Sequence, residues 1–280
     1  MRFLTTLLVA GAAVLAASAD EMKKDRWYFS VGAGADNLPV MEQNGRNRDI
    51  ALYPHRDFSN LPDGKPKGYR WLYDLETDPG YLVQAVVGRM FKSGGRLELR
   101  YSRRNASLEQ NFNSISYLYG ETIQYKDIDI QSNSQSSVGG LETDTLALNV
   151  YYGVPVAGGK ITPYLGGGIG LSFVKIRDLY YESNFTGTQP PDAPPLETFN
   201  GLQDADLNGT APTQILSAGV DYRLTNETLI GLKWTYAVVD DIEKEAYYQK
   251  HPIIGLTNIT RFSGMNHWSI GIEVKYLLGE

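Results

Sequence analysis

The chain has 280 residues and no cysteine, and its 26 basic and 32 acidic side chains give a formal net charge of −6. The acidic balance argues against a nucleic-acid-binding protein. The lack of cysteine excludes a disulfide framework, a cysteine-ligated metal site and a lipid-modified N-terminal cysteine. Tyrosine is abundant, at 19 residues, which suits both membrane–water interfaces and binding loops.

The first 19 residues have the three parts of a secretory signal peptide. Arg2 supplies a positive charge, Phe3 to Ala16 is apolar, and Ala17-Ser18-Ala19 is a small-residue cleavage site. The apolar part is shorter than the roughly 20 residues that a membrane-spanning helix needs. We therefore predict a signal peptide over residues 1–19 and a single outer-membrane domain over 20–280. Removing Arg2 changes the net charge to −7.

Apolar and polar residues alternate in a series of short segments, separated by connectors that are alternately short and long. Successive side chains of a strand point to opposite faces, so each segment reads as one apolar and one mostly polar column. The expected strands cover residues 26–35, 81–91, 97–102, 145–152, 164–173, 213–224, 230–236 and 267–277. Membrane crossings by tilted strands need about 9–11 residues, and outer-membrane barrels have even strand numbers. The pattern predicts an all-β fold, an eight-stranded antiparallel transmembrane up-and-down barrel with short periplasmic turns.

A soluble β-sandwich would also alternate, so the placement of aromatic residues is a second test. In a bilayer, aromatic side chains collect at both ends of the lipid-facing column. The predicted aromatic girdle consists of Trp27, Phe91, Tyr152, Tyr222 and Tyr276 at the periplasmic ends and Tyr81, Phe173, Tyr236 and Trp268 at the outer ends. All nine fall in the apolar column of their strand, which favours the barrel. In the strand over 81–91 both columns are apolar. Tyr81 and Phe91 assign the column of odd-numbered residues to the lipid side, and this column includes Arg89.

Four long connectors are expected to be extracellular loops, covering roughly residues 36–79, 105–143, 175–212 and 239–265. In the second, Ser114–Tyr119 and Thr122–Tyr125 flank a Gly-Glu pair and predict a hairpin above the membrane. The alternative is an extra strand pair in the wall, which would give ten strands. The proline-rich segment 189–195 is expected to be mobile, because proline removes amide donors.

Charged residues occupy the inward column of the expected strands. They are Glu98, Arg100, Asp221, Arg223, Lys233, Glu273 and Lys275. An eight-stranded barrel encloses a space about wide enough for its own side chains. We predict that these opposite charges pair and fill the lumen as structural charges, and inward glycines leave room for them. The alternative is a narrow ion path.

The segment His267-Trp268-Ser269 is a candidate hydrolytic site. A serine activated by a histidine, with the acid Glu273 further down the same face, follows the logic of a hydrolase. The motif looks similar to the His-x-Ser of outer-membrane lipid A deacylases. Here, however, Trp268 takes the lipid face and the other two point inward, so we expect no catalytic residue. With three histidines we also expect no metal and no cofactor, and we interpret the acidic runs 127–129 and 240–245 as solvated loop charge rather than calcium sites.

Two segments resemble a known family. The run Thr162–Gly170 (TPYLGGGIG) and the ending Gly271–Tyr276 (GIEVKY) are similar to the outer-membrane β-barrel family of opacity-like proteins and bacterial surface antigens. The resemblance implies the outer membrane of a Gram-negative bacterium. It also implies three partners: outer-membrane lipid, the barrel-insertion machinery and an unknown extracellular ligand. The chain departs from the family at Leu277–Glu280, which stands where the usual terminal aromatic insertion signal would be, and Tyr276 could take that role.

The leading hypothesis is a non-enzymatic surface barrel that displays long loops for adhesion or ligand contact and supports the envelope. Loop tyrosines would provide contact surface, namely Tyr117, Tyr119, Tyr125, Tyr180, Tyr181, Tyr247 and Tyr248. One alternative is a small porin or transport channel. The other is an outer-membrane lipid-modifying hydrolase.

Overall fold

The computed structural model describes residues 25–48, 63–65, 68–123, 129–188, 191, 195–247, 249 and 257–279. The predicted signal peptide, Tyr125 and Tyr248 lie outside this described part, and of the segment 189–195 only Pro191 and Pro195 are described. None of the described residues forms a helix long and apolar enough to cross a membrane.

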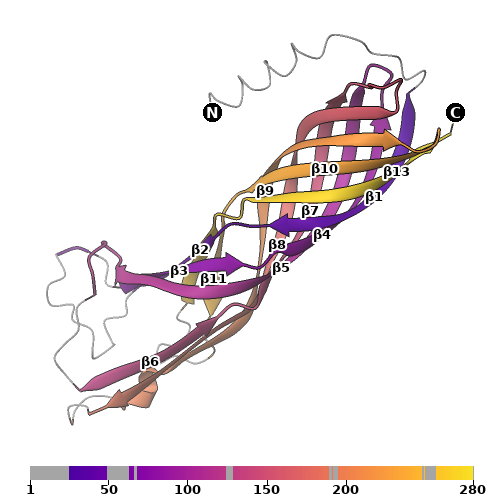
Figure 1. The fold of residues 1–280 in the computed structure, drawn as a ribbon. Helices are drawn as coiled ribbons and strands as arrows, with labels where there is room; N and C mark the ends of the chain where they lie inside the picture. The colour runs from indigo at the N-terminus through magenta and orange to yellow at the C-terminus, as the bar shows by residue number, and fades with distance from the viewer. Residues whose placement is uncertain are drawn as a thin grey trace.

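Eight strands form a closed antiparallel ring, which is the barrel at the upper right of Figure 1. In ring order they are β1 (Arg26–Asn37), β4 (Gly80–Met90), β5 (Gly95–Tyr117), β7 (Gly140–Gly153), β8 (Ile161–Gly187), β9 (Gly201–Arg223), β10 (Thr228–Val239) and β13 (His267–Leu278). The first and last strands close it, with Val31 opposite Val274. Each expected strand lies in one of these eight, and only Phe91 and Leu224 fall one residue past a strand end. The predicted fold class is confirmed and the ten-stranded alternative is wrong.

The wall of the ring is apolar on the outside and polar on the inside. Exposed Val31, Leu148 and Ile169, the last with 71% of its surface exposed, alternate with buried polar residues such as Asn149 and Ser172. The odd column of β4 faces outward, as Tyr81 and Phe91 predicted. A closed ring leaves no backbone group unpaired along its edges, so hydrocarbon can surround it.

Tight turns join the strands at the rim that also carries the described ends of the chain (Figure 1). In the turn after β4, the Phe91 N–H donates to the Gly95 carbonyl oxygen at 2.8 Å and the Gly94 N–H to the Phe91 carbonyl oxygen at 2.9 Å. Gly94 has a φ of +88°, and a Cβ there would meet the Gly153 carbonyl oxygen at 2.5 Å. Only glycine satisfies both conditions, which explains why this short turn can reverse the chain so sharply.

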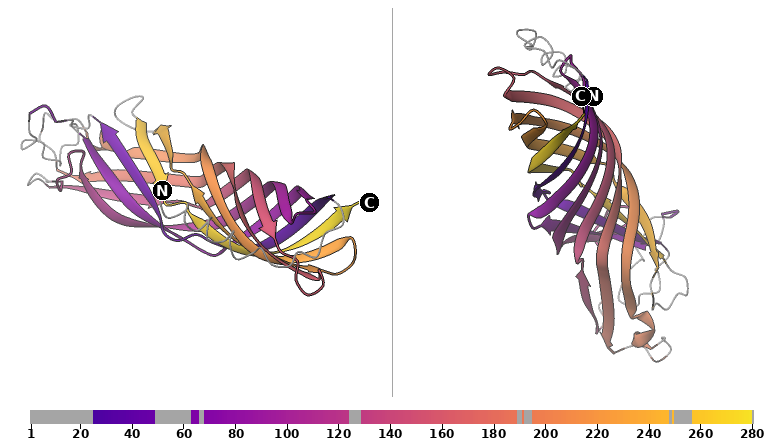
Figure 2. Two further views of the ribbon diagram at one scale, coloured as in Figure 1. Left: turned by 90° about the horizontal axis from the view of Figure 1, so that it is seen from above. Right: turned by 90° about the vertical axis from the view of Figure 1, so that its right-hand side faces the viewer.

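Beyond the opposite rim, the strands continue into an extension with two arms that diverge in Figures 1 and 2. The first arm contains β2 (Met41–Arg48), β3 (Gly68–Thr77), β11 (Ile242–Tyr247), β12 (Thr257–Ser263) and the outer part of β5, in the order β11-β12-β2-β3-β5. The second arm contains β6 (Ile130–Ser137), the outer parts of β8 and β9, and the short 3-10 helix η1 (Leu196–Phe199). The extension is therefore mostly paired strand.

The structure differs from the prediction of four long loops, because much of each connector is paired strand. Five of the strands lie within them, and β5, β8 and β9 run 23, 27 and 23 residues, far past the ring. A strand with water on its outer side needs no continuous apolar column, so the alternation that revealed the ring is lost there.

The predicted hairpin at Ser114–Tyr119 also has a different partner. The end of β5 pairs with β3, with Tyr117 opposite Tyr69. Among the described residues, a single bridge, from Ser116 to Thr122, joins it to the segment expected as its partner. The strand β3 lies about 45 residues earlier in the chain, and local pattern did not indicate this long-range pairing.

Candidate functional site: the lumen and the crevice between the arms

Six of the seven predicted lumen charges are buried inside the ring, and five of them form one chain of ion pairs. Lys233 Nζ lies 3.2 Å from Glu98 Oε2 and 3.2 Å from Glu273 Oε1. Lys275 Nζ lies 3.0 Å from Glu273 Oε2 and 2.6 Å from Asp221 Oδ1. The four strands that carry these residues are thereby tied across the lumen. A buried carboxylate or ammonium needs such partners, since it is costly to bury alone.

The arginines extend this network. Arg100 Nη2 lies 3.7 Å from Glu98 Oε2 and also donates a hydrogen bond to the Tyr151 hydroxyl oxygen. The seventh predicted charge, Arg223, is only half-buried, and within the described part of the chain it has no carboxylate partner. Arg223 sits at the last position of β9, next to the periplasmic turn, where water can solvate it.

Several members of the network were not singled out from the sequence. Arg96 binds Asp221, the Tyr28 hydroxyl donates to Glu98 Oε1 at 2.5 Å, and Gln84 Nε2 donates to Glu273 Oε1 at 2.5 Å. The alternation itself would have found Arg96, because it shares the parity of Glu98. Tyrosine and glutamine at inward positions gave no comparable signal.

Large rings fill the remaining lumen, and glycine makes the space for them. The Tyr164 ring lies under two cations, with its centroid 4.7 Å from the Arg96 guanidinium carbon and 5.0 Å from Lys275 Nζ. A Cβ on Gly219 would meet the Tyr164 hydroxyl oxygen at 2.4 Å, and one on Gly88 would meet the Tyr28 ring at 2.5 Å. The inward glycines thus accommodate tyrosine rings as well as the predicted long cations.

Side chains also fill the outer end of the lumen. Above an ion pair between Arg104 and Asp36 at 3.3 Å, buried apolar side chains from nearly all sides of the ring form one cluster, which we call the apolar layer. Its members are Leu38, Met41, Leu75, Leu108, Val138, Leu141, Val174, Ile176, Leu179, Leu207, Ala211, Val239, Ile242, Phe262 and Met265. From the rim with the tight turns toward the outer rim, the lumen is therefore filled by paired charges and then by apolar side chains.

The candidate hydrolytic residues do not form a triad. His267 and Ser269 are buried, while the Trp268 side chain is 41% exposed on the outer face. The Nδ1 atom of His267 lies 3.3 Å from the Met265 carbonyl oxygen, and its Nε2 lies 4.0 Å from Asp36. Among the described residues, no hydrogen bond joins the side chains of His267 and Ser269. The Glu273 carboxylate forms ion pairs with Lys233 and Lys275 instead.

The nine predicted girdle aromatics lie on the outside of the ring. Eight are exposed, and Phe91 is half-buried beneath Arg89, whose guanidinium carbon lies 5.4 Å from the ring centroid. Arg89 also pairs with Asp25 at 3.0 Å, near the periplasmic rim. At the outer rim, Tyr236 and Trp268 are direct ladder partners. These positions suit an interfacial belt at each end of the wall.

The acidic run 240–245 is engaged by arginines. Arg261 Nε donates to Asp241 at 3.0 Å, and Arg46 donates to Glu243 at 3.1 Å. Of the run 127–129, only Asp129 is described. Among the described residues, no group of three or more metal-ligating side chains comes together.

The loop tyrosines fall into two groups. Tyr117 is buried and stacks on Tyr119 with ring centroids 5.3 Å apart, so these two pack internally. Tyr180 and Tyr181, by contrast, line an open space between the two arms. Nothing is described of the Tyr247 side chain.

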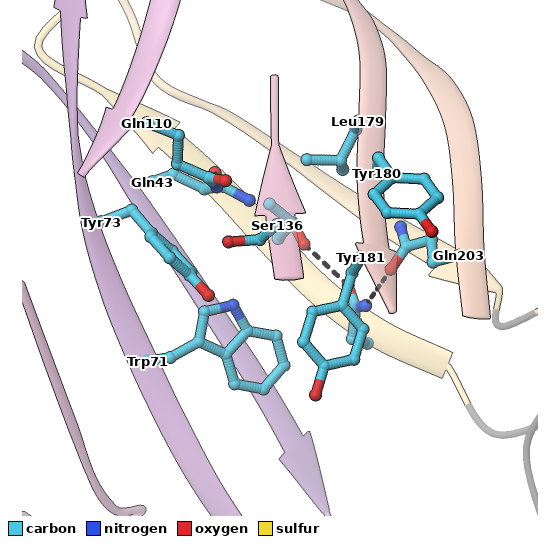
Figure 3. A pocket seen from close by; sticks show the side chains of 11 residues that line it. Gln43, Trp71, Tyr73, Gln110, Ser136, Leu179, Tyr180, Tyr181 and Gln203 are labelled. Carbon is cyan, nitrogen blue, oxygen red and sulfur yellow. Dashed lines mark hydrogen bonds between the residues drawn. The ribbon is translucent and has the colours of Figure 1, made fainter. Parts of the chain in front are cut away.

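That space is a crevice with contributions from both arms, shown in Figure 3. Its enclosed volume is about 20 Å³, and it opens to solvent. Its aromatic side chains are Trp71, Tyr73, Tyr180 and Tyr181, and its amide side chains are Gln43, Gln110, Gln203 and Asn258. Of the described side chains that line it, none carries a formal charge. Sequence reasoning did not identify this site, because its residues come from β2, β3, β5, β6, β8, β9 and β12.

No protein-family model matches the chain, and no curated protein matches it. Among solved structures, it is similar to the outer membrane protein OprG from Pseudomonas aeruginosa, with a TM-score of 0.46, 12% identity, and coverage of 92% of this chain and 97% of that one. It is also similar to Neisserial surface protein A, with a TM-score of 0.37, 11% identity, and coverage of 89% of this chain and 96% of that one. A third similar structure is the attachment invasion locus protein Ail of Yersinia pestis, with a TM-score of 0.31, 8% identity, and coverage of 89% of this chain and 99% of that one.

All three TM-scores are below 0.5, too low to transfer any property of those proteins to this chain. The chain's own geometry is sufficient for the coarser conclusion. A closed eight-stranded ring with an exposed apolar wall and a polar interior is the architecture of outer-membrane barrels. The chain has the fold of an eight-stranded transmembrane β-barrel of the outer-membrane type, which confirms the predicted fold class.

Proposed function

We propose that the protein is a non-enzymatic outer-membrane barrel that holds a stiff two-armed extension for contact with an extracellular ligand. The observation that supports this is the continuity of the strands. From Phe173 at the outer aromatic belt to Gly187, β8 runs on for about 45 Å at 3.3 Å per residue. A binding surface built on paired strands loses less conformational entropy on binding than one built on flexible loops.

The lumen charges and the aromatic girdle have structural roles in this proposal. The ion-pair network fixes how the strands face one another across the ring, and the aromatic belts set the depth of the barrel in the bilayer. The proposal also includes removal of residues 1–19 as a signal peptide and insertion of the single domain 20–280 by the barrel-insertion machinery. The filled lumen favours this function over a porin.

Removing the extension while keeping the ring tests the proposal. Four ladder pairs at the outer rim mark where short turns can join the strands: Asp36 with Gly80, Ser107 with Gly140, Lys175 with Asn208, and Ala237 with His267. We expect the shortened barrel to insert normally but to lose binding of expressing cells to cultured cells and to matrix-coated surfaces.

Two controls make the result interpretable. Protease resistance of the ring in purified outer membranes shows that the shortened barrel has folded, and a chain that keeps only the second arm shows whether both arms are needed. If cells carrying the shortened barrel bind as well as cells carrying the full chain, the extension is not the contact surface and the proposal is wrong.

A further inference from the structure

We propose that the free edge of β6, in the second arm, binds an extended segment of an extracellular polypeptide by adding it as a further strand. This rests on the proposed function and names the kind of ligand that the extension contacts. The edge of a strand presents backbone N–H and C=O groups at a fixed spacing. Another extended backbone is the partner that matches all of these groups at once.

Beyond the ring, neighbouring strands part in two places, between β9 and β11 and between β5 and β6. The first gap is bridged by Gln249, whose N–H donates to the Leu202 carbonyl oxygen at 2.8 Å and whose Nε2 donates to the Asp204 carbonyl oxygen at 2.8 Å. At the second, β6 continues the line of β7 along β8, while β5 leaves with the first arm (Figures 1 and 2). Among the described residues, no hydrogen bond joins β5 to β6, so β6 pairs on one side only.

Every second residue of β6 turns its backbone groups away from β8. The Thr188 N–H donates to the Asp129 carbonyl oxygen at 2.8 Å, and these two residues lie opposite each other in the register of the ladder. Along an antiparallel pair, residues that exchange hydrogen bonds alternate with residues that do not. Counting from Asp129, the residues at even positions therefore direct their N–H and C=O groups to the open edge: Ile130, Ser132, Ser134 and Ser136. At roughly 3.4 Å per residue, this row is about 20 Å long.

The sequence of β6 does nothing to protect this edge. Proteins commonly block an exposed edge with charged side chains or proline. The terminal strand of the first arm, β11, has three consecutive charged residues, Glu243 to Glu245. In contrast, β6 (IQSNSQSS) contains neither a charged residue nor proline, and Gln131 to Gln135 are all exposed. The β6 edge is therefore open to a strand from another molecule.

The side chains of β6 indicate which kind of segment fits. On the paired side, Phe185 of β8 lies opposite Ser132, and Tyr181 lies opposite Ser136. The small side chains of β6 thus accommodate large neighbours, and aromatic side chains stabilise cross-strand pairs. In the middle of the open row, the hydroxyl oxygens of Ser132 and Ser134 lie 3.3 Å apart. We expect the ligand to be an extended segment that is rich in aromatic residues and has no proline.

The test uses the full chain in detergent micelles and a fluorescent peptide with the sequence of Tyr180–Gly187 (YYESNFTG), the segment that pairs with the other side of β6. We expect the peptide to bind, measured by fluorescence anisotropy. Ser134→Pro removes a free N–H and places a proline ring on the open edge, so it should weaken binding by about tenfold or more. Ser134→Ala keeps the backbone N–H, so this matched control should bind like the wild type.

Amide hydrogen exchange, followed by NMR, locates the bound peptide. Without peptide, the N–H groups of Ser132 and Ser134 should exchange quickly, while that of Asn133, which points to β8, should exchange slowly. With about nine-tenths of the chains occupied, exchange at the two serines should slow by about tenfold, because it proceeds only from the free tenth. Asn133 should not change. This measurement uses the wild-type chain, so it decides the proposal even if Ser134→Pro does not fold.

No binding of the peptide, or binding that leaves exchange at Ser132 and Ser134 unchanged, would overturn the proposal. A folded Ser134→Pro variant that binds like the wild type would do the same. Slow exchange of both serine amides without peptide would assign the edge to another occupant: a second copy if dilution restores fast exchange, and a segment of the same chain if it does not. If the peptide fails to bind but the shortened barrel still loses cell binding, the proposed function stands and only the strand addition falls.

Discussion

Replacing Glu273 with alanine is expected to destabilise the folded barrel by about 3–5 kcal/mol, the cost of breaking a buried ion pair by removing one partner. The Glu273 carboxylate is fully buried and binds both Lys233 and Lys275, and it accepts a hydrogen bond from Gln84. Its removal leaves two buried ammonium groups with one carboxylate neighbour each, Glu98 and Asp221. Urea unfolding in lipid vesicles measures the change.

A surface glutamate is the matched control. Glu109 is exposed on the extension, so Glu109→Ala should leave the urea midpoint unchanged. If Glu273→Ala were as stable as this control, the lumen lysines would have to be solvated, and the ion-pair network would not be what fills the barrel.

The full-length protein is expected to give no steady openings in planar lipid bilayers. An ion would have to pass the network around Glu273 and then the apolar layer that contains Leu141 and Phe262. Paired charges leave no carboxylate free to guide a cation, and an apolar constriction excludes water by dewetting. The Glu273→Ala variant should also be silent, because the apolar layer is intact in it.

Steady, ion-selective openings of the wild-type protein would contradict this arrangement and favour the porin alternative. Openings that appear only in Glu273→Ala would show that the charged network alone closes the lumen. In that case the apolar layer would be permeable to water.

The ring could be predicted from the sequence because lipid outside and a polar lumen inside impose a strict period of two. Lys233 and Glu273 were assigned to the lumen by their parity alone. Their partners could not be assigned, because contacts across a barrel depend on strand tilt and stagger, which local pattern does not encode. Lys275 illustrates this, since it bridges Glu273 on its own strand and Asp221 on β9.

The extension could not be predicted in the same way. In β6, polar residues stand on both faces (IQSNSQSS), so no column marks it as a strand. The partner of β2 on one side is β12, which lies more than 200 residues later in the chain. The crevice depends on these long-range pairings, so Gln43 and Asn258 gave no signal as members of one site.

Labelling of single cysteines tests the central claim most directly, because the chain has no native cysteine. The claim is that lipid covers the wall while the extension stands outside the cell. On intact cells, a membrane-impermeant maleimide should label Glu109→Cys on the extension. It should label Asn226→Cys, in a periplasmic turn, only after the outer membrane is permeabilised, and it should not label Ile169→Cys on the wall in either case. Labelling of Ile169→Cys, or of Asn226→Cys before Glu109→Cys, would contradict the claim.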